Sequence, residues 1–179
     1  MLHTDTAALV VIDVQGKLAH TMHDKEALFK GLQTMVKAAK LLDLPVLWAE
    51  QLPEKLGPTI PELSDLLSDD KPIAKSCFSC AGNADFNEVL ARSGRRQLLV
   101  VGIEAHICVT QSTLEFLARG YDVHLVCDAV GARSPSNKAL GLARCERAGA
   151  VLSSCEMALF ELMRDATHPQ FKAIQRLII

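Results

Sequence analysis

The feature that most constrains the fold is a regular alternation of short apolar runs with longer segments of helical periodicity. Six runs have strand length, the clearest being AALVVIDV at residues 7–14 and QLLVVGI at residues 97–103. Continuous apolar strands are expected where helices cover both faces of a parallel sheet. The alternation therefore predicts an α/β protein with a three-layer α/β/α architecture and a six-stranded, mainly parallel sheet.

The other elements follow from the same periodicities. Strands are predicted at residues 45–50, 72–75, 122–130 and 150–154, and residues 51–61 are predicted to be a long loop. Helices are predicted at residues 25–42, with Asp24 as the N-cap, and at 62–67, 84–93, 106–119 and 136–148, followed by a C-terminal helical region that Pro169 interrupts.

Length and composition limit the domain count and the classes of partner. The 179 residues fit a single domain spanning residues 1–179, and a net charge of −2 with dispersed Lys and Arg does not favour nucleic-acid binding. No apolar stretch is long enough to span a membrane, and no signal peptide is recognised, so we expect a cytoplasmic protein. The six cysteines are then expected to be free thiols.

Three reactive side chains are predicted to lie just beyond the carboxyl ends of strands, where ligands bind in such sheets. Asp13 and Lys75 each close an apolar run, and Cys108 follows another run into the first turn of a predicted helix. A helix N-terminus favours a thiolate, a carboxylate can accept the thiol proton, and an ammonium group can stabilise the resulting anion. Together these residues predict acyl-transfer hydrolysis, although each alone is compatible with a structural role.

Other candidate residues are less specific. Cys77 and Cys80 form a Cys-x-x-Cys pair, which is compatible with a redox role, but no second pair or His-x3-5-His is present to complete a zinc site. His106 could contact a substrate near Cys108 or be a capping or exposed residue. We therefore predict no metal and no cofactor.

Four motifs in order resemble the isochorismatase-like hydrolases: VVIDVQ, K-x-x-F-S at residues 75–79, GIEAHICV at 102–109 and GYDVHLVCDAV. The tail HPQFKAIQRLI is most similar to the branch called isochorismatase domain-containing proteins. The resemblance implies the isochorismatase-like hydrolase fold and a catalytic triad of Asp13, Lys75 and Cys108. It also implies a cis peptide between Ile103 and Glu104 that directs N–H groups at the substrate oxygen.

The resemblance further implies that Gln15 and Phe78 lie near the substrate pocket and that the protein is a homo-oligomer, a dimer or tetramer. Metal-dependent relatives carry Asp-x-His after the second strand, where this chain has Glu50 and Gln51. We expect a metal-independent cysteine hydrolase that acts on a small amide, carbamoyl or ester substrate. The alternatives are an isochorismatase-type vinyl ether hydrolase, a non-catalytic binding member of the fold and a thiol redox protein.

Overall fold

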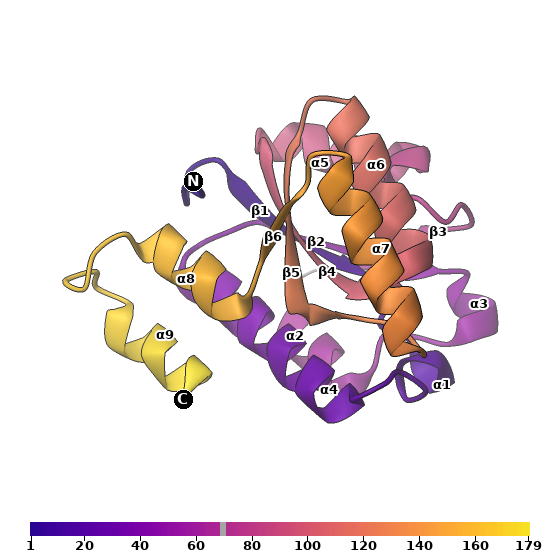
Figure 1. The fold of residues 1–179 in the computed structure, drawn as a ribbon, viewed down its shortest axis with the longest axis horizontal. Coiled ribbons are helices and arrows are strands. Elements are labelled where there is room, and N and C mark those ends of the chain that lie inside the picture. Colours follow the sequence, from indigo (N-terminus) through magenta and orange to yellow (C-terminus); the bar gives the residue numbers. More distant parts are fainter. Residues whose placement is uncertain (69–70) are drawn as a thin grey trace.

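A single parallel sheet organises the protein in the computed structural model, which describes residues 1–68 and 71–179 (Figure 1). Its strand order is β3-β2-β1-β4-β5-β6, and all neighbouring strands pair in parallel. The strands are β1 (Ala7–Ile12), β2 (Val46–Gln51), β3 (Ile73–Lys75), β4 (Gln97–Ile103), β5 (Asp122–Gly131) and β6 (Val151–Ser153). The predicted six-stranded sheet is confirmed.

Helices follow most strands, as a parallel sheet with crossover connections requires. They are α1 (Gly16–Ala19), α2 (Lys25–Leu41), α3 (Pro53–Leu56), α4 (Pro61–Ser64), α5 (Ala84–Ser93), α6 (Thr110–Ala118), α7 (Pro135–Arg147), α8 (Cys155–Met163) and α9 (Phe171–Ile178). Three further short helical turns are η1 (Asp65–Leu67), η2 (Cys80–Gly82) and η3 (Ala105–Val109). No helix in the described parts of the chain is long and apolar enough to cross a membrane.

The helices form two layers, one on each face of the sheet (Figure 1). In β1, Leu9 and Val11 join a buried cluster with residues of α2 and α8, whereas Val10 and Ile12 join a second cluster with residues of α5 and α6. Successive strand residues point to opposite faces, so a strand covered on both sides must be apolar throughout. This explains the uninterrupted apolar runs and confirms the three-layer architecture.

The strand order reverses between β1 and β4, which are hydrogen-bonded neighbours at the centre of the sheet. Gly102 allows these two strands to approach closely at their carboxyl ends. Its φ is +120°, and a Cβ atom there would lie 2.1 Å from the carbonyl oxygen of Ile12. A side chain at this position would therefore force the two strands apart at the carboxyl edge of the sheet, where ligands bind in many α/β proteins.

Three local predictions differ from the structure. The predicted loop at 51–61 contains helix α3, which begins at Pro53, a residue whose fixed φ suits a first helical position. Asp24 adopts a left-handed conformation with φ of 49° and makes no capping hydrogen bond. Cys108 lies in the π-helical turn η3 rather than in the first turn of α6, which begins at Thr110.

Candidate active site

Asp13 is the first residue after β1 and turns the chain away from the sheet. Its backbone has a positive φ of 55°, a region that Asp adopts more readily than most residues. Its backbone N–H donates to the carbonyl oxygen of Ala49 (3.1 Å), which anchors the turn to the neighbouring strand. The side chain is almost fully buried, so its carboxylate requires a partner inside the protein.

Lys75, the last residue of β3, supplies that partner. Its Nζ donates to Asp13 Oδ2 at 2.7 Å and to Gln51 Oε1 at 2.7 Å. The carbonyl oxygens of Cys77 and Phe78 lie at 3.2 and 3.1 Å from the same nitrogen. The side chain of Lys75 has no exposed surface, so this ammonium group is bound entirely by protein atoms.

Cys108 lies beside this pair, at 7% exposure, in the turn that follows β4. Its thiol interacts with both Asp13 and Lys75. The second carboxylate oxygen of Asp13, Oδ1, is buried and has no hydrogen-bond partner among the described residues. A buried carboxylate that interacts with a thiol is suited to accept its proton.

Burial dominates the protonation of these groups. Burial raises the pKa of the Cys108 thiol, the negative charge of Asp13 raises it further, and Lys75 opposes both effects. Burial also raises the pKa of Asp13, and Lys75 opposes that change. These effects favour the thiol form of Cys108, so a base is needed to form the thiolate. The expectation that a helix N-terminus stabilises the thiolate stays a prediction.

The residues predicted to flank the pocket differ in their environments. Phe78 exposes its ring (53%) next to the Lys75 site. His106 is half-buried in η3, with Nε2 3.3 Å from Asn137 Nδ2 and with no partner for Nδ1 in the described parts of the chain. Gln15 has no exposed surface, and both ends of its amide bind backbone groups, so the structure gives it a framework position rather than a substrate contact.

The turn after β4 starts with a cis peptide bond between Ile103 and Glu104. The Glu104 side chain is buried, and its carboxylate accepts hydrogen bonds from the Arg133 side chain (Nε, 3.1 and 3.2 Å) and from the Arg133 backbone N–H (3.2 Å). These bonds tie the turn that carries Cys108 to the segment that follows β5. The turn is thereby anchored at its start, four residues before Cys108.

The sequence is similar to a known family of proteins over most of its length. The family model described as "Isochorismatase domain" matches residues 7–157, which include all three reactive residues. The chain belongs to the isochorismatase family. Isochorismatase domain-containing protein 2 from Homo sapiens is 40% identical over 173 residues, which are 97% of this chain and 83% of that protein. The predicted resemblance is confirmed.

Solved structures of similar proteins share the fold over nearly the whole length. MAR1 ribonuclease from Caenorhabditis elegans has a TM-score of 0.92 at 34% identity, covering 99% of this chain and 91% of its own. YcaC from Pseudomonas aeruginosa, solved with hexane-2,5-diol and covalent acrylamide, has a TM-score of 0.93 at 27% identity, covering 98% and 90%. The isochorismatase-like hydrolase fold is thus shown for this family member.

Gln51 is a site residue of this isochorismatase-family protein that the sequence analysis did not select. Its side chain contacts the Lys75 ammonium directly. The available signal was its position, because it closes the apolar run of β2 just as Asp13 follows β1 and Lys75 closes β3.

The Cys-x-x-Cys pair lies next to Lys75 but forms no disulfide bond. Cys77 and Cys80 are both free thiols, and burial raises the pKa of Cys80 to about 12. Across residues 1–68 and 71–179, no group of three or more His, Cys, Asp or Glu side chains is arranged to hold a metal ion. Both the redox role and the metal-free mechanism stay predictions.

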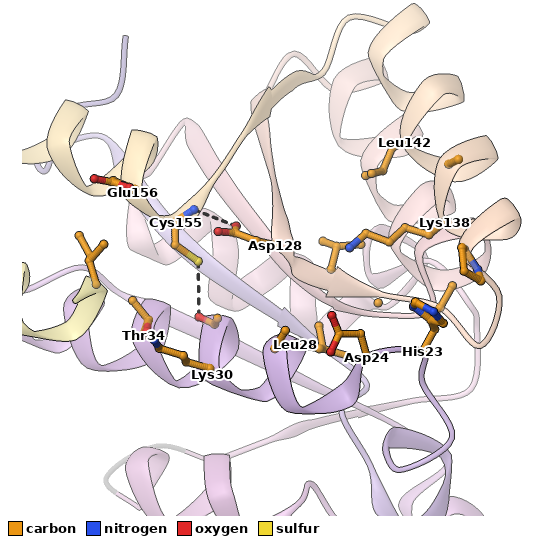
Figure 2. A pocket seen from close by; sticks show the side chains of 18 of the residues that line it. His23, Asp24, Leu28, Lys30, Thr34, Asp128, Lys138, Leu142, Cys155 and Glu156 are labelled. Carbon is orange, nitrogen blue, oxygen red and sulfur yellow. Dashed lines mark hydrogen bonds between the residues drawn. The ribbon is translucent and has the colours of Figure 1, made fainter.

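A large cavity, drawn in Figure 2, is lined by none of the three reactive residues. It is a groove of about 670 Å³ between α2 and α7, with β5 as its floor and the start of α8 at one side. Cys155 lies at this side, where its backbone N–H donates to Asp128 Oδ1 (2.8 Å). A smaller cavity of about 280 Å³ contacts Lys75, next to Leu52 and Asn83. The groove is therefore a surface distinct from the candidate active site.

Proposed function

We propose that this isochorismatase-family hydrolase is a cysteine hydrolase that cleaves a small amide, carbamoyl or ester substrate without a metal. The observation that carries the proposal is the buried contact between Lys75 and Asp13, with the thiol of Cys108 interacting with both. An ion pair that is removed from water next to a cysteine costs desolvation energy, which a purely structural role does not require.

In the proposed first step, the Asp13 carboxylate accepts the Cys108 proton while the sulfur forms a bond to the substrate carbonyl carbon. The carbonyl π electrons move to oxygen, and backbone N–H groups of the turn around Glu104 and Cys108 are proposed to bind this oxyanion. The Lys75 ammonium stabilises the negative charge on the sulfur as it forms. Asp13 then returns the proton to the leaving amine or alcohol, which departs as the C=O bond re-forms.

The second step releases the acyl group from the enzyme. Asp13, again a carboxylate, accepts a proton from a water molecule as the water oxygen attacks the thioester carbon. Collapse of this tetrahedral intermediate breaks the C–S bond, and the sulfur recovers its proton from Asp13. The products are a carboxylic acid and the original thiol, so the cycle consumes one water molecule and needs no redox partner.

The YcaC relative supports the presence of a reactive nucleophile in proteins of this fold. Its structure contains covalent acrylamide, an electrophile that carries a primary amide group and reacts readily with thiolates. Vinyl ether cleavage, as in true isochorismatases, needs no covalent cysteine, so the presence of Cys108 beside the ion pair favours acyl transfer. In a non-catalytic binding member of the family, the buried ion pair of Asp13 and Lys75 would have no catalytic role to offset its desolvation cost.

A second candidate function comes from the C. elegans relative, which is named a ribonuclease. The net charge of −2 and the near-complete burial of Asp13 and Lys75 favour a small molecule over a polyanionic chain. Incubation with single-stranded RNA separates the two functions. RNA cleavage that the Cys108→Ala substitution abolishes would replace the small-molecule proposal.

The pH dependence of activity tests the role of Asp13. Because burial raises the pKa of this carboxyl, the base form is lost at a higher pH than for an ordinary Asp. We expect hydrolysis to rise with pH through an acid limb above the ordinary value of 3.8 and then to level off. In Asp13→Asn the plateau should be absent, with activity rising only in the alkaline range where the thiol ionises unaided.

The stability of the fold should also depend on the protonation of Asp13, but it should fall with rising pH where the activity rises. Between the ordinary pKa and the raised pKa of Asp13, the folded protein holds a proton that the unfolded chain has released, so this residue makes unfolding easier as the pH rises through that window. Asp13→Asn should remove that contribution. An acid limb that is unchanged in Asp13→Asn would exclude Asp13 as the base.

We also propose that the protein is a homo-oligomer, as predicted, and that the groove between α2 and α7 forms the interface between subunits. Strand β6 pairs with β5 only at 124–126, so in the described structure residues 127–131 have no neighbouring strand on that side. The elements that line or adjoin the groove carry exposed apolar side chains: Leu140 on α7, Val151 on β6 and Met157 on α8. The groove also carries both lysines and carboxylates, which can complement their own copies across a two-fold axis.

Light scattering after size exclusion tests this surface. We expect the wild type to elute as a dimer or tetramer and the double variant Leu140→Glu, Met157→Glu to elute as a monomer, because each substitution places a charge in an apolar contact. Val89→Glu is the matched control, since Val89 is an exposed apolar residue of α5, away from the groove. A monomeric wild type would refute the proposal.

Cellular location is not fixed by the family. A relative from Phytophthora sojae, 37% identical over 97% of this chain and 84% of its own, is named a secreted isochorismatase effector. The cytoplasmic location therefore stays a prediction. The free cysteines are compatible with it, because free thiols persist in reducing compartments.

A further inference from the structure

The ammonium group of Lys75 has three hydrogen-bond acceptors in addition to Asp13. Two contacts are short, to Asp13 Oδ2 and Gln51 Oε1, both at 2.7 Å. The Cys77 and Phe78 carbonyl oxygens are more distant, at 3.2 and 3.1 Å. Gln51 therefore provides a neutral acceptor that is as close as the carboxylate.

The orientation of the Gln51 amide is fixed by the hydrogen bond that its nitrogen makes. Its Nε2 donates to the carbonyl oxygen of Ser76 at 2.7 Å, so its oxygen must face the lysine. A rotated amide would place two N–H groups against an ammonium and would leave the Ser76 carbonyl without this donor. The side chain is 6% exposed, which leaves little access for water to replace these bonds.

The backbone of Gln51 is held in turn by the Gln15 side chain. Gln15 Oε1 accepts from the Gln51 N–H at 2.6 Å, and Gln15 Nε2 donates to the Gln51 carbonyl at 3.1 Å and to the Gly57 carbonyl at 2.7 Å. The backbone pairing of β1 with β2 ends at Ala49. The Gln15 amide therefore continues the strand pairing for one more residue, after β1 itself has turned away at Asp13.

We propose that Gln51, held by the side-chain amide of Gln15, is a positioning residue that fixes the Lys75 ammonium between Asp13 and the thiol of Cys108. This inference rests on the proposed cysteine hydrolase function. Gln51 acts on the reaction through Lys75, since its own side chain is occupied by Lys75 and Ser76. Gln15 acts one step further back, through the Gln51 backbone.

The charge of the acceptor explains why a glutamine suits this position. A second carboxylate at 2.7 Å would neutralise the ammonium and weaken its effect on a forming thiolate. An apolar side chain would remove one of the two short acceptors and leave that ammonium proton with only the more distant Cys77 and Phe78 carbonyl oxygens, and the lysine would shift towards them. A neutral amide satisfies the proton and leaves the positive charge directed at Asp13 and Cys108.

A double-mutant cycle with acrylamide as the probe tests the proposal. The rate of acrylamide addition to Cys108 is measured by mass spectrometry at pH 7 in the wild type, Gln51→Leu, Lys75→Met and the double variant. We expect Gln51→Leu to slow the reaction about tenfold in the wild-type background, in the range that small displacements of a catalytic group produce. In the Lys75→Met background it should have no further effect, because the group that it positions is absent. Lys75→Gln replaces Lys75→Met if the latter does not fold.

Gln97→Leu is the matched control. Gln97 is also a buried, hydrogen-bonded glutamine of the sheet, but it opens β4 at the opposite edge and bonds to His3 and Thr6. The Gln97→Leu substitution should lower the stability of the protein without changing the rate of acrylamide addition to Cys108. Equal slowing by Gln51→Leu in both backgrounds, or none in either, would overturn the positioning role. A wild type in which Cys108 reacts no faster than the other cysteines would instead contradict the proposed function itself.

Discussion

Replacing Cys108 with alanine is expected to abolish hydrolysis and leave the fold intact. The substitution removes the sulfur that forms the acyl intermediate, and water has no comparable activation at the same point, so activity should fall at least about a thousand-fold. The cost in stability should be about 1 kcal/mol, as for a small truncation in a packed region. Activity is measured on whichever member of a panel of small amides, carbamoyl compounds and activated esters the wild type hydrolyses.

Cys145→Ala provides the control for this experiment. Cys145 is a buried cysteine of α7 in the same core cluster, and it makes a weak hydrogen bond to Thr110. It should show a similar loss of stability and retain full activity. If Cys108→Ala keeps hydrolytic activity, the cysteine is not the nucleophile, and the vinyl ether alternative gains support.

Replacing Lys75 with methionine is expected to cause the largest loss of stability in the site. The fully buried Asp13 carboxylate would lose the ammonium at 2.7 Å, and breaking a buried ion pair from one side costs about 3–5 kcal/mol. The cost should shrink as the pH falls, because an Asp13 without its lysine is protonated more readily and then carries no charge. Chemical denaturation at pH 7 and pH 5 measures both effects.

Activity of the Lys75→Met protein should also fall, by about a hundred-fold, because the thiolate loses the cation that stabilises it. Lys172→Met, on the exposed side of α9, is the control and should change neither stability nor activity. A Lys75→Met protein with equal stability at both pH values would mean that Asp13 stays ionised without the lysine, which would contradict the expected rise in the pKa of Asp13.

The fold could be predicted from the sequence because its main signal is local. A strand buried on both faces must be apolar at almost every position, and residues 7–12 and 98–103 carry no polar side chain. The short elements were less predictable. Helix α3 has only four residues, and its stability depends on contacts with distant parts of the chain.

The candidate site was predictable only in part, for a physical reason. Polar residues at the ends of apolar strands identified Asp13 and Lys75, since parallel strands bring their carboxyl ends to one edge. The state of Cys108 was not predictable, because its pKa is governed by burial and by a carboxylate 95 positions earlier in the chain. The partnership of Gln15 with Gln51 likewise joins residues that no local pattern connects.

The most direct test of the central claim is the rate at which acrylamide modifies each of the six cysteines at pH 7, resolved by mass spectrometry. The account predicts that Cys108 reacts fastest despite its burial, and that Asp13→Asn slows this site alone, because the carboxylate must first remove the thiol proton. If Cys108 reacts no faster than the other five cysteines, or reacts equally fast in Asp13→Asn, the proposed nucleophile and base are contradicted.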